Sequence, residues 1–458
     1  MAKVKSKWIC QQCGYESAGY LGKCPECGAW TSFVEEVQSS LKPQNVSPQG
    51  IANDTKPSLI NDIHIGEEVR VSTNISEFDR ILGGGLVQGS LVLIAGDPGI
   101  GKSTILLQTS GELCNNGQKI LYVSAEESAS QLKLRANRLG INSDKLYIYP
   151  QTNLESIRQQ ITELQPDTIV IDSIQAIYSQ TISSSAGSVS QIRECCNILM
   201  QIAKTQNITV IVIGHVTKDG NIAGPKILEH MVDTVISFEG DKYKSYRMLR
   251  SMKNRFGNTS EVGIFEMQAK GLVEVKNPNE LFLNERSQDA IPGSAIIVTN
   301  EGTRPLLVEI QALVGTTPYP TPRRVTNGVD NSRLLQILAV LEKRVGLNLS
   351  KQDVYINVMG GIEIDEPSAD LGIALAIATC ARDVVVDPQT VIIGEIGLSG
   401  EIHPVSNIEK RLNEAVTSGF KKAIIPYANR NIENEKIKIV PVKRLIDAIT
   451  ACISPNQD

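Results

Sequence analysis

The sequence lacks three features: a strong net charge, a long apolar run and an apolar segment behind its N-terminus. Its formal net charge is −5 over 458 residues, whereas many passive nucleic-acid binders are strongly basic overall. A basic face confined to part of the surface is still compatible with this composition. Apolar runs such as Thr168–Asp172 have the length of a strand, far below the ~20 residues of a membrane helix. We therefore expect no membrane span.

The N-terminal segment and the cysteines together indicate the compartment. Residues 1–7 are basic and no apolar segment follows them, so we expect no signal peptide and a cytoplasmic protein. Four of the nine cysteines lie within the first 27 residues, which in a reducing compartment indicates metal ligands rather than disulfides. The other five stand in apolar surroundings and are expected to be buried thiols: Cys114, Cys195, Cys196, Cys380 and Cys452.

Composition and patterning predict four parts along the chain. Residues 1–34 hold the clustered cysteines, and residues 35–64 form a flexible linker rich in Ser, Pro, Asn and Gln. In residues 65–275, short apolar runs alternate with helical patterns, which indicates βαβ units and a parallel sheet covered on both faces. The later runs of this block lack long helices between them and are expected to extend one side of the sheet. Residues 280–458 alternate strands and helices again.

Four cysteines in two matching pairs predict a structural metal site. Cys10 and Cys13 form one C-x-x-C pair, Cys24 and Cys27 form the other, and a glycine follows each pair. Each pair presents two thiolates to one ion, and four thiolates complete a tetrahedral site that favours zinc, with rubredoxin-like iron as the weaker alternative. All four positions would be filled by protein, so the site is structural, and a segment this short needs such a staple to fold.

A complete phosphate-binding loop follows the run 90–96. Its eight residues match G-x-x-x-x-G-K-[ST], with Thr104 directly behind them: Gly96, Asp97, Pro98, Gly99, Ile100, Gly101, Lys102 and Ser103. The glycines let backbone N–H groups curl round a phosphate, Lys102 reaches the β- and γ-phosphates, and Ser103 places its hydroxyl on Mg²⁺. The loop therefore predicts binding of ATP with Mg²⁺.

Polar residues at the ends of other buried runs predict hydrolysis. Asp172 ends the run 168–172 and is the expected carboxylate on the Mg²⁺ side. Glu126 and Glu127 follow the run 119–124, at the carboxyl end of a strand, where open α/β sheets place their chemistry. We favour Glu126 as the group that activates water and expect Glu127 to cap the next helix. His215 ends another strand and is a candidate sensor of the γ-phosphate, with an ordinary polar loop residue as the alternative.

A resemblance to a known family rests on several of these segments together. The loop GDPGIGKST, the segment SAEES, the VID strand end and the five residues Lys253, Asn254, Arg255, Phe256 and Gly257 resemble the bacterial RadA/Sms DNA repair family. The resemblance implies a RecA-like P-loop ATPase core that assembles into hexameric rings, binds single-stranded and branched DNA, and drives branch migration. It also implies a RecA-type recombinase as functional partner.

The KNRFG segment is the signature of that resemblance, and we expect it beyond the sheet edge near a strand end. Lys253 and Arg255 are two residues apart, so on a strand they point the same way. Two cations on one face suit a phosphate, including the ATP of a neighbouring subunit reached in the manner of an arginine finger. A solvated basic turn is the alternative.

The block after residue 280 resembles the proteolytic domain of Lon. Ser368 falls on the position of Lon's nucleophilic serine, but Glu409 occupies the position of the lysine that activates it, and Asp370 replaces a glycine. Lys410 is adjacent, yet one residue along a helix turns a side chain by about 100°. We expect no protease activity and a scaffold for ring assembly and DNA contact. The candidate phosphate contacts, for each of which a plain surface charge is the alternative, are Arg304, Arg323, Arg324, Arg333, Lys343 and Arg344.

Three functions remain to be compared. The leading one is a ring-forming, DNA-stimulated ATPase that processes recombination intermediates. A Lon-like ATP-dependent protease fits the order of motor and Lon-like block, but Glu409 argues against it. A KaiC-like ATP-switched assembly protein fits the segment 82–86, LGGGL, but the cysteine pairs and KNRFG argue against it. The predicted fold is α/β throughout the two large domains, with a zinc ribbon in front.

Overall fold

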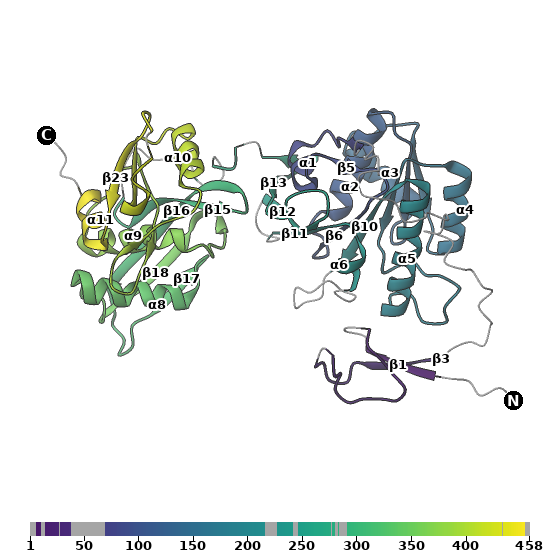
Figure 1. Ribbon diagram of the computed structural model, residues 1–458, viewed down its shortest axis with the longest axis horizontal. Coiled ribbons are helices and arrows are strands. Elements are labelled where there is room, and N and C mark those ends of the chain that lie inside the picture. The colour runs from purple at the N-terminus through teal and green to yellow at the C-terminus, as the bar shows by residue number, and fades with distance from the viewer. Residues whose placement is uncertain are drawn as a thin grey trace, which may run out of the picture. The chain divides into compact units, whose positions relative to one another are not determined.

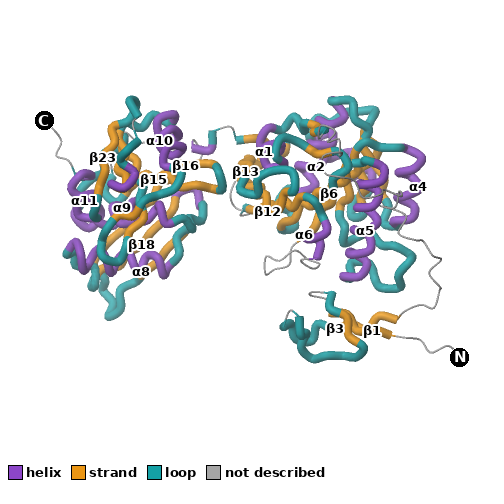
Figure 2. Tube along the Cα trace, in the orientation of Figure 1, coloured by secondary structure: helices purple, strands orange, loops and turns teal. Residues whose placement is uncertain are grey.

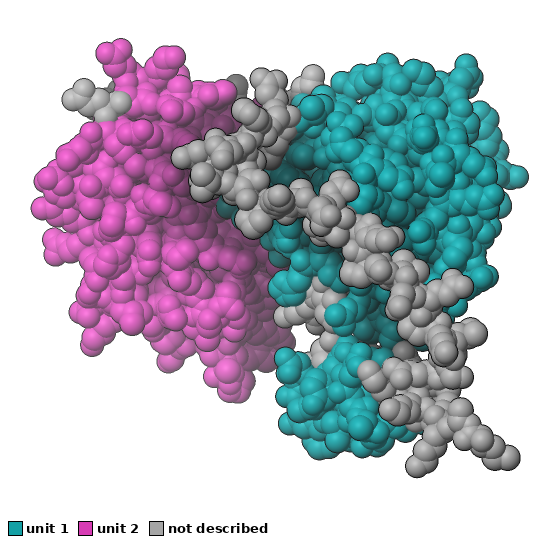
Figure 3. Space-filling model, turned by 45° about the vertical axis from the view of Figure 1, so that its right-hand side comes forward, with its two compact units in different colours: residues 1–275 teal, residues 276–458 magenta. Residues whose placement is uncertain are grey.

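The structure is a computed structural model (Figure 1). It describes residues 6–10, 14–26, 28–37, 69–215, 227–240, 246–275, 277–279, 283, 291–432 and 434–453. The chain divides into two units, residues 1–275 and 276–458, which are coloured separately in Figure 3. Among the described helices, none combines the length and the apolar character that crossing a membrane requires.

The N-terminal segment forms a small antiparallel sheet in the order β2-β1-β3. Its strands are β1 (Ser6–Cys10), β2 (Glu16–Ser17) and β3 (Phe33–Val37). Cys10 and Cys24 are buried in one cluster with Phe33. Residues 35–37 were predicted to belong to the linker, but they pair with β1 and complete β3. The rest of the predicted linker lies outside the described residues.

The next block is built on a nine-stranded sheet with the order β14-β13-β12-β11-β6-β10-β9-β7-β8. The six strands from β11 to β8 run parallel, and β12, β13 and β14 extend the sheet antiparallel on one side, as the missing helices predicted. The strands are β6 (Leu91–Gly96), β7 (Ile120–Ser124), β8 (Leu146–Pro150), β9 (Thr168–Asp172), β10 (Thr209–His215), β11 (Thr234–Glu239), β12 (Tyr246–Asn254), β13 (Val262–Gln268) and β14 (Gly271–Glu274). A short pair, β4 (Arg70–Val71) and β5 (Leu86–Val87), precedes β6.

Helices cover both faces of this sheet (Figure 2). Alternate residues of β6 point to opposite faces, so Val92 and Ile94 pack with α1, α2 and α3, while Leu91 and Leu93 pack with α4, α5 and α6. These helices are α1 (Ser76–Leu82), α2 (Lys102–Asn115), α3 (Ala129–Arg138), α4 (Leu154–Leu164), α5 (Val189–Gln206) and α6 (Ile227–Met231). Burial on both sides explains why the central runs are continuously apolar.

The C-terminal unit holds a seven-stranded mixed sheet in the order β17-β18-β16-β15-β19-β22-β23. Its strands are β15 (Ser294–Glu301), β16 (Arg304–Thr316), β17 (Arg324–Asn327), β18 (Gln352–Val358), β19 (Thr390–Ile392), β22 (Lys422–Pro426) and β23 (Lys438–Val442). The helices are α8 (Asn331–Val340), which continues as a π-helix over Leu341–Val345, α9 (Asp370–Arg382), α10 (Ile408–Thr417) and α11 (Leu445–Cys452). A short hairpin pairs β20 (Glu395–Ile396) with β21 (Ile402–His403).

Two helices pack on opposite faces of that sheet. α10 covers Val298 and its neighbours, whereas α9 packs on the side of Ile297. Gly372 of α9 lies so close that a Cβ atom would come within 2.1 Å of Ile297 Cγ2. Only glycine therefore fits at this helix–sheet contact.

Candidate active site

The phosphate loop lies in the middle of the nine-stranded sheet. β6 ends at Gly96 between the carboxyl ends of β10 and β11, and α2 begins six residues later. A Cβ on Gly96 would lie 2.6 Å from the carbonyl oxygen of Phe238, and Gly101 has a φ of +122° that side chains disfavour. The loop therefore needs its glycines for close packing as well as for its turn.

Lys102 lies within this loop. Its Nζ donates to the carbonyl oxygens of Gly96 at 2.6 Å and Asp97 at 2.8 Å, and the residue is 4% exposed. Burial lowers the pKa of Lys102, while the carboxylates of Asp172, Asp97 and Glu126 oppose that shift. Two backbone carbonyl oxygens of the loop thus hold the ammonium of Lys102 in place.

Asp172 stands beside the loop at the end of β9. Its carboxylate accepts from the Tyr122 hydroxyl at 2.9 Å and from the Ser103 hydroxyl. Burial raises the pKa of Asp172, and the hydrogen bonds from Ser103 and Tyr122 work against that rise. A carboxylate next to a hydroxyl is an oxygen donor set that suits Mg²⁺, so the two side chains fit the predicted metal.

Glu126 is held by residues from two other strand ends. Its Oε1 accepts from Ser173 Oγ at 2.5 Å and lies 3.0 Å from His215 Nε2. Burial would raise the pKa of Glu126, but the hydrogen bonds from Ser173 and His215 outweigh burial and leave the pKa below its usual value. The carboxylate is therefore kept ionised and oriented, which is what a general base requires.

Glu127 has a different environment, and its predicted role is wrong. The N-cap of α3 is Ser128, which forms a capping box with Gln131. Glu127 instead pairs with Arg135, with 2.6 Å between Oε1 and Nη2. Arg135 lies on α3, eight residues after Glu127, and the sequence next to Glu127 does not indicate this partner.

The KNRFG segment lies at the amino ends of the parallel strands, whereas the phosphate loop lies at their carboxyl ends. Asn254 ends β12 and pairs with Thr234, which pairs with Val92 near the start of β6. Gly96 is four residues further along β6, roughly 13 Å at about 3.3 Å per residue. The predicted position near a strand end is confirmed, because β12 ends within KNRFG. The predicted position beyond the sheet edge is wrong, because β12 is an internal strand between β11 and β13.

Both cations of KNRFG contact the segment that ends α6. Lys253 Nζ donates to the carbonyl oxygens of Glu229 at 2.7 Å and Val232 at 2.8 Å, and also to that of His230. Arg255 Nη1 lies 3.4 Å from Asp233 Oδ1, and its side chain is 55% exposed. Burial and the nearby Arg255 lower the pKa of Lys253, against the pull of two carboxylates.

The other residues of KNRFG bind the LGGG turn after α1. Asn254 Nδ2 donates to the carbonyl oxygen of Leu82 at 3.1 Å. A Cβ on Gly257 would lie 3.0 Å from the Cα of Gly83, so the two glycines pack tightly. Arg70 bridges the two segments through the carbonyl oxygens of Gly83 and Phe256. Two motifs that suggested different families by sequence therefore form one structural unit.

In the C-terminal unit, a guanidinium contacts the serine at the Lon nucleophile position. Arg411 Nη1 donates to Ser368 Oγ at 3.2 Å and to the carbonyl oxygen of Val298 at 2.6 Å, and Nη2 pairs with Glu366. Arg411 is fully buried, whereas Glu409 and Lys410 are exposed. A guanidinium remains protonated and cannot take a proton from a hydroxyl. The sequence comparison with Lon missed Arg411.

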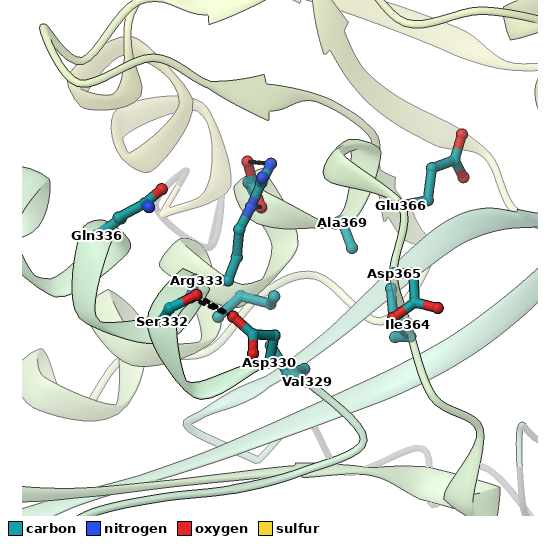
Figure 4. A pocket seen from close by; sticks show the side chains of 11 residues that line it. Val329, Asp330, Ser332, Arg333, Gln336, Ile364, Asp365, Glu366 and Ala369 are labelled. Carbon is teal, nitrogen blue, oxygen red and sulfur yellow. Dashed lines mark hydrogen bonds and ion pairs between the residues drawn. The ribbon is translucent and has the colours of Figure 1, made fainter. Parts of the chain in front are cut away.

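A pocket of about 220 Å³ is lined by Glu366, Ala369 and Asp370, which lie on either side of this serine in the sequence (Figure 4). Arg333 enters it from α8 and binds Asp370 through two nitrogens, with 2.6 Å from Nε to Oδ1. The ion pair explains why an aspartate replaces the Lon glycine at this position. It also engages Nε and Nη2 of Arg333, which is one of the candidate phosphate contacts.

The N-terminal sheet presents two equivalent cysteine turns. The N–H of Gly14 donates to the carbonyl oxygen of Cys10 at 2.8 Å, and that of Gly28 donates to Cys24 at 2.9 Å. Both glycines have positive φ, so each turn closes behind a buried thiol. Cys13 and Cys27 lie outside the described residues. The two turns and their shared thiol cluster fit the four-thiolate zinc site.

Zinc removal is expected to unfold this ribbon alone, because a three-stranded sheet of this size has too small a core to fold without metal. Metal analysis should find one zinc per chain, and Cys24→Ser should lose it together with hydrogen-exchange protection in β1 and β3. Cys380→Ser serves as the control, since Cys380 lies in the C-terminal unit and accepts from the Val314 N–H. A ribbon that stays protected without metal would contradict the site.

Comparison with known proteins matches three separate segments of the chain to three different families. Models of three families match: the AAA domain over residues 67–221, the ChlI subunit of Mg-chelatase over residues 326–429, and a zinc ribbon described as rubredoxin metal binding domain over residues 8–35. An archaeal KaiC-like protein, PH0186 of Pyrococcus horikoshii, aligns at a TM-score of 0.39 and 23% identity over 45% of this chain and 99% of its own. That likeness is too weak to support an inference.

Several relatives that align over nearly the whole chain are DNA repair proteins named RadA. The Bacillus subtilis protein is 51% identical over 453 residues, which cover 98% of this chain and 99% of the relative. The Halalkalibacterium halodurans protein is 52% identical over 94% of both chains, and the Synechocystis protein is 48% identical over 100% of this chain and 96% of its own. The chain thus belongs to the RadA family of bacterial DNA repair proteins, with a RecA-like ATPase core, an N-terminal zinc ribbon and a C-terminal Lon-like domain.

Proposed function

We propose that this protein is a DNA-stimulated ATPase that works as a hexameric ring and drives branch migration at recombination intermediates. The observation that carries the proposal is the position of Glu126, which Ser173 and His215 hold beside the phosphate loop and Asp172. An oriented carboxylate at this edge of the sheet supports hydrolysis, beyond binding, of ATP.

Each residue of the site has a distinct role in this proposal. Lys102 binds the β- and γ-phosphate oxygens, and Glu126 accepts the proton of the attacking water. Ser103 and Asp172 would hold Mg²⁺, which when bound neutralises charge that develops on the phosphates. His215 keeps Glu126 oriented and is positioned to respond to the γ-phosphate.

The KNRFG cations are proposed to act on a neighbouring subunit. Lys253 and Arg255 lie at the opposite end of the sheet from Gly96, so neither reaches the phosphate loop of its own chain. In a ring, one subunit can present this end to the loop of the next. The 55% exposure of Arg255 supports a role as an arginine finger that reaches out of its own chain.

The C-terminal unit is proposed to serve in ring assembly and DNA contact. The contact of Arg411 with Ser368 supports a structural role for the former nucleophile position, because the group that faces the hydroxyl cannot act as a base. Single-stranded and branched DNA and a RecA-type recombinase are the proposed partners, in keeping with the DNA repair proteins to which the chain is related.

We expect single-stranded DNA to raise the ATPase rate of the intact protein several-fold, because a motor hydrolyses ATP while it moves on its track. The same preparation should show a hexamer by native mass spectrometry and should move the branch point of a synthetic three-strand junction. Lys102→Ala protein supplies the blank for each assay. A monomer whose ATPase ignores DNA would overturn the proposal.

A further inference from the structure

A buried carboxylate behind KNRFG is shared by two cations. Asp233 is 1% exposed, and its Oδ2 accepts from the Leu91 N–H at 3.0 Å and from Lys204 Nζ at 2.8 Å. The other oxygen, Oδ1, lies 3.4 Å from Arg255 Nη1. Asp233 therefore joins the last turn of α5, the start of β6 and the KNRFG segment.

The two cations hold this carboxylate unequally. Lys204 makes the shorter contact, and its ammonium also lies 5.9 Å from the centre of the Phe256 ring, within the range of a cation–π contact. Arg255 makes a single long contact and leaves more than half of its side chain in solvent. Lys204 is thus the closer counter-ion of the buried carboxylate, and the side chain of Arg255 is held by one long contact.

That inequality matters because a buried carboxylate without a cation is costly and recruits whichever cation is near. The ammonium of Lys253 acts on Asp233 through its charge but is bound to backbone carbonyl oxygens. Without Lys204, Arg255 would be the remaining cation in contact with Asp233, and its guanidinium can form two parallel hydrogen bonds with a carboxylate. Such a pair would hold Arg255 against its own chain. The same loss would remove the cation that faces the Phe256 ring.

We propose that Lys204 is a positioning residue for the KNRFG finger: by neutralising Asp233, it leaves Arg255 free to bind the phosphates of a neighbouring subunit's ATP. The proposal rests on the proposed function, in which KNRFG acts between subunits. Lys204 itself touches no nucleotide, and the role differs from that of an ordinary ion pair at the end of a helix, which would only stabilise α5.

Lys204→Met keeps the length and apolar stem of the side chain and removes its charge. We expect it to lower the DNA-stimulated kcat of the full-length protein about tenfold, equivalent to about 1.4 kcal/mol in the barrier, with the KM for ATP unchanged. Lys204→Arg should restore the rate because it restores the cation. Arg193→Met removes an exposed cation from the same helix and should behave as wild type.

Mixed rings separate this role from a local one. Lys102→Ala subunits have a defective loop but an intact finger. Mixing them with Lys204→Met subunits should therefore raise the ATPase rate per competent loop several-fold above that of rings made of Lys204→Met subunits only. Mixing with Arg255→Ala subunits is the reference for action between subunits. Recovery in both mixtures supports the proposal. Recovery with Arg255→Ala but not with Lys204→Met overturns the positioning role of Lys204 and leaves the action of KNRFG between subunits standing.

The remaining outcomes are equally decisive. If neither mixture recovers, action between subunits fails and the positioning role fails with it. A Lys204→Met protein with wild-type kcat also overturns the proposal. A further case is that Lys204→Met lowers the melting temperature by several degrees and Lys204→Arg restores the melting temperature without restoring kcat. That pair of results would show that the ion pair only stabilises α5.

Discussion

Replacing Glu126 by glutamine is expected to lower kcat for ATP by about 10²- to 10⁴-fold, the usual contribution of a positioned general base. Glutamine has nearly the same shape and can still bond to Ser173 and His215, so the fold and the affinity for ATP should be retained. Single-turnover hydrolysis and fluorescent-nucleotide binding, measured on the same preparation, would separate chemistry from binding. A loss of binding in parallel with kcat would mean that Glu126 only supports the loop.

The adjacent residue provides a matched control for that experiment. Glu127→Gln makes the same chemical change one position away, but Glu127 is paired with Arg135 and is not held toward the loop by Ser173 or His215. Its kcat should stay close to that of the wild type, with only a modest loss of stability from the weakened ion pair. A larger loss of kcat in Glu127→Gln than in Glu126→Gln would reverse the assignment of the base.

The residues of the nucleotide site were accessible to sequence analysis because parallel strands end at one edge. Glu126, Asp172 and His215 each follow a strand-like apolar run, and a parallel sheet brings such positions together whatever the connections between them. The apolar runs do not predict which of these side chains form hydrogen bonds with one another. The contact between Glu126 and His215 joins residues 89 positions apart, and only the strand order places them as partners.

The cations outside the loop were much harder to assign. Lys204 and Arg411 each lie on an amphipathic helix, where a charged residue usually faces solvent. Their partners, Asp233 and Ser368, are 29 and 43 residues away and come from other elements. A sequence comparison with Lon directs attention to Glu409 and Lys410, whereas the fold turns Arg411 inward.

Substitution of Arg411 by methionine is expected to have the largest effect on stability, about 3 kcal/mol or more, because it leaves a partner of a buried ion pair uncompensated. Arg411 joins three elements through Glu366, the carbonyl oxygen of Val298 and the carbonyl oxygen of Ser406. Native-state hydrogen exchange of amides in β15 and α10 reports this local unfolding free energy without a two-state assumption for the whole chain.

A double-mutant cycle tests whether the ion pair is the cause. Glu366→Gln combined with Arg411→Met removes both charges. The double variant should therefore lose less unfolding free energy, by about 1–3 kcal/mol, than the two single variants lose in sum. Arg430→Met is the surface control, because Arg430 is exposed and its side chain contacts Tyr427, through the ring and the carbonyl oxygen. This substitution should change stability by less than about 0.5 kcal/mol. Strict additivity in the cycle would mean that Arg411 acts through its contacts with backbone carbonyls, and that Glu366 is incidental to the stability of this part of the C-terminal unit.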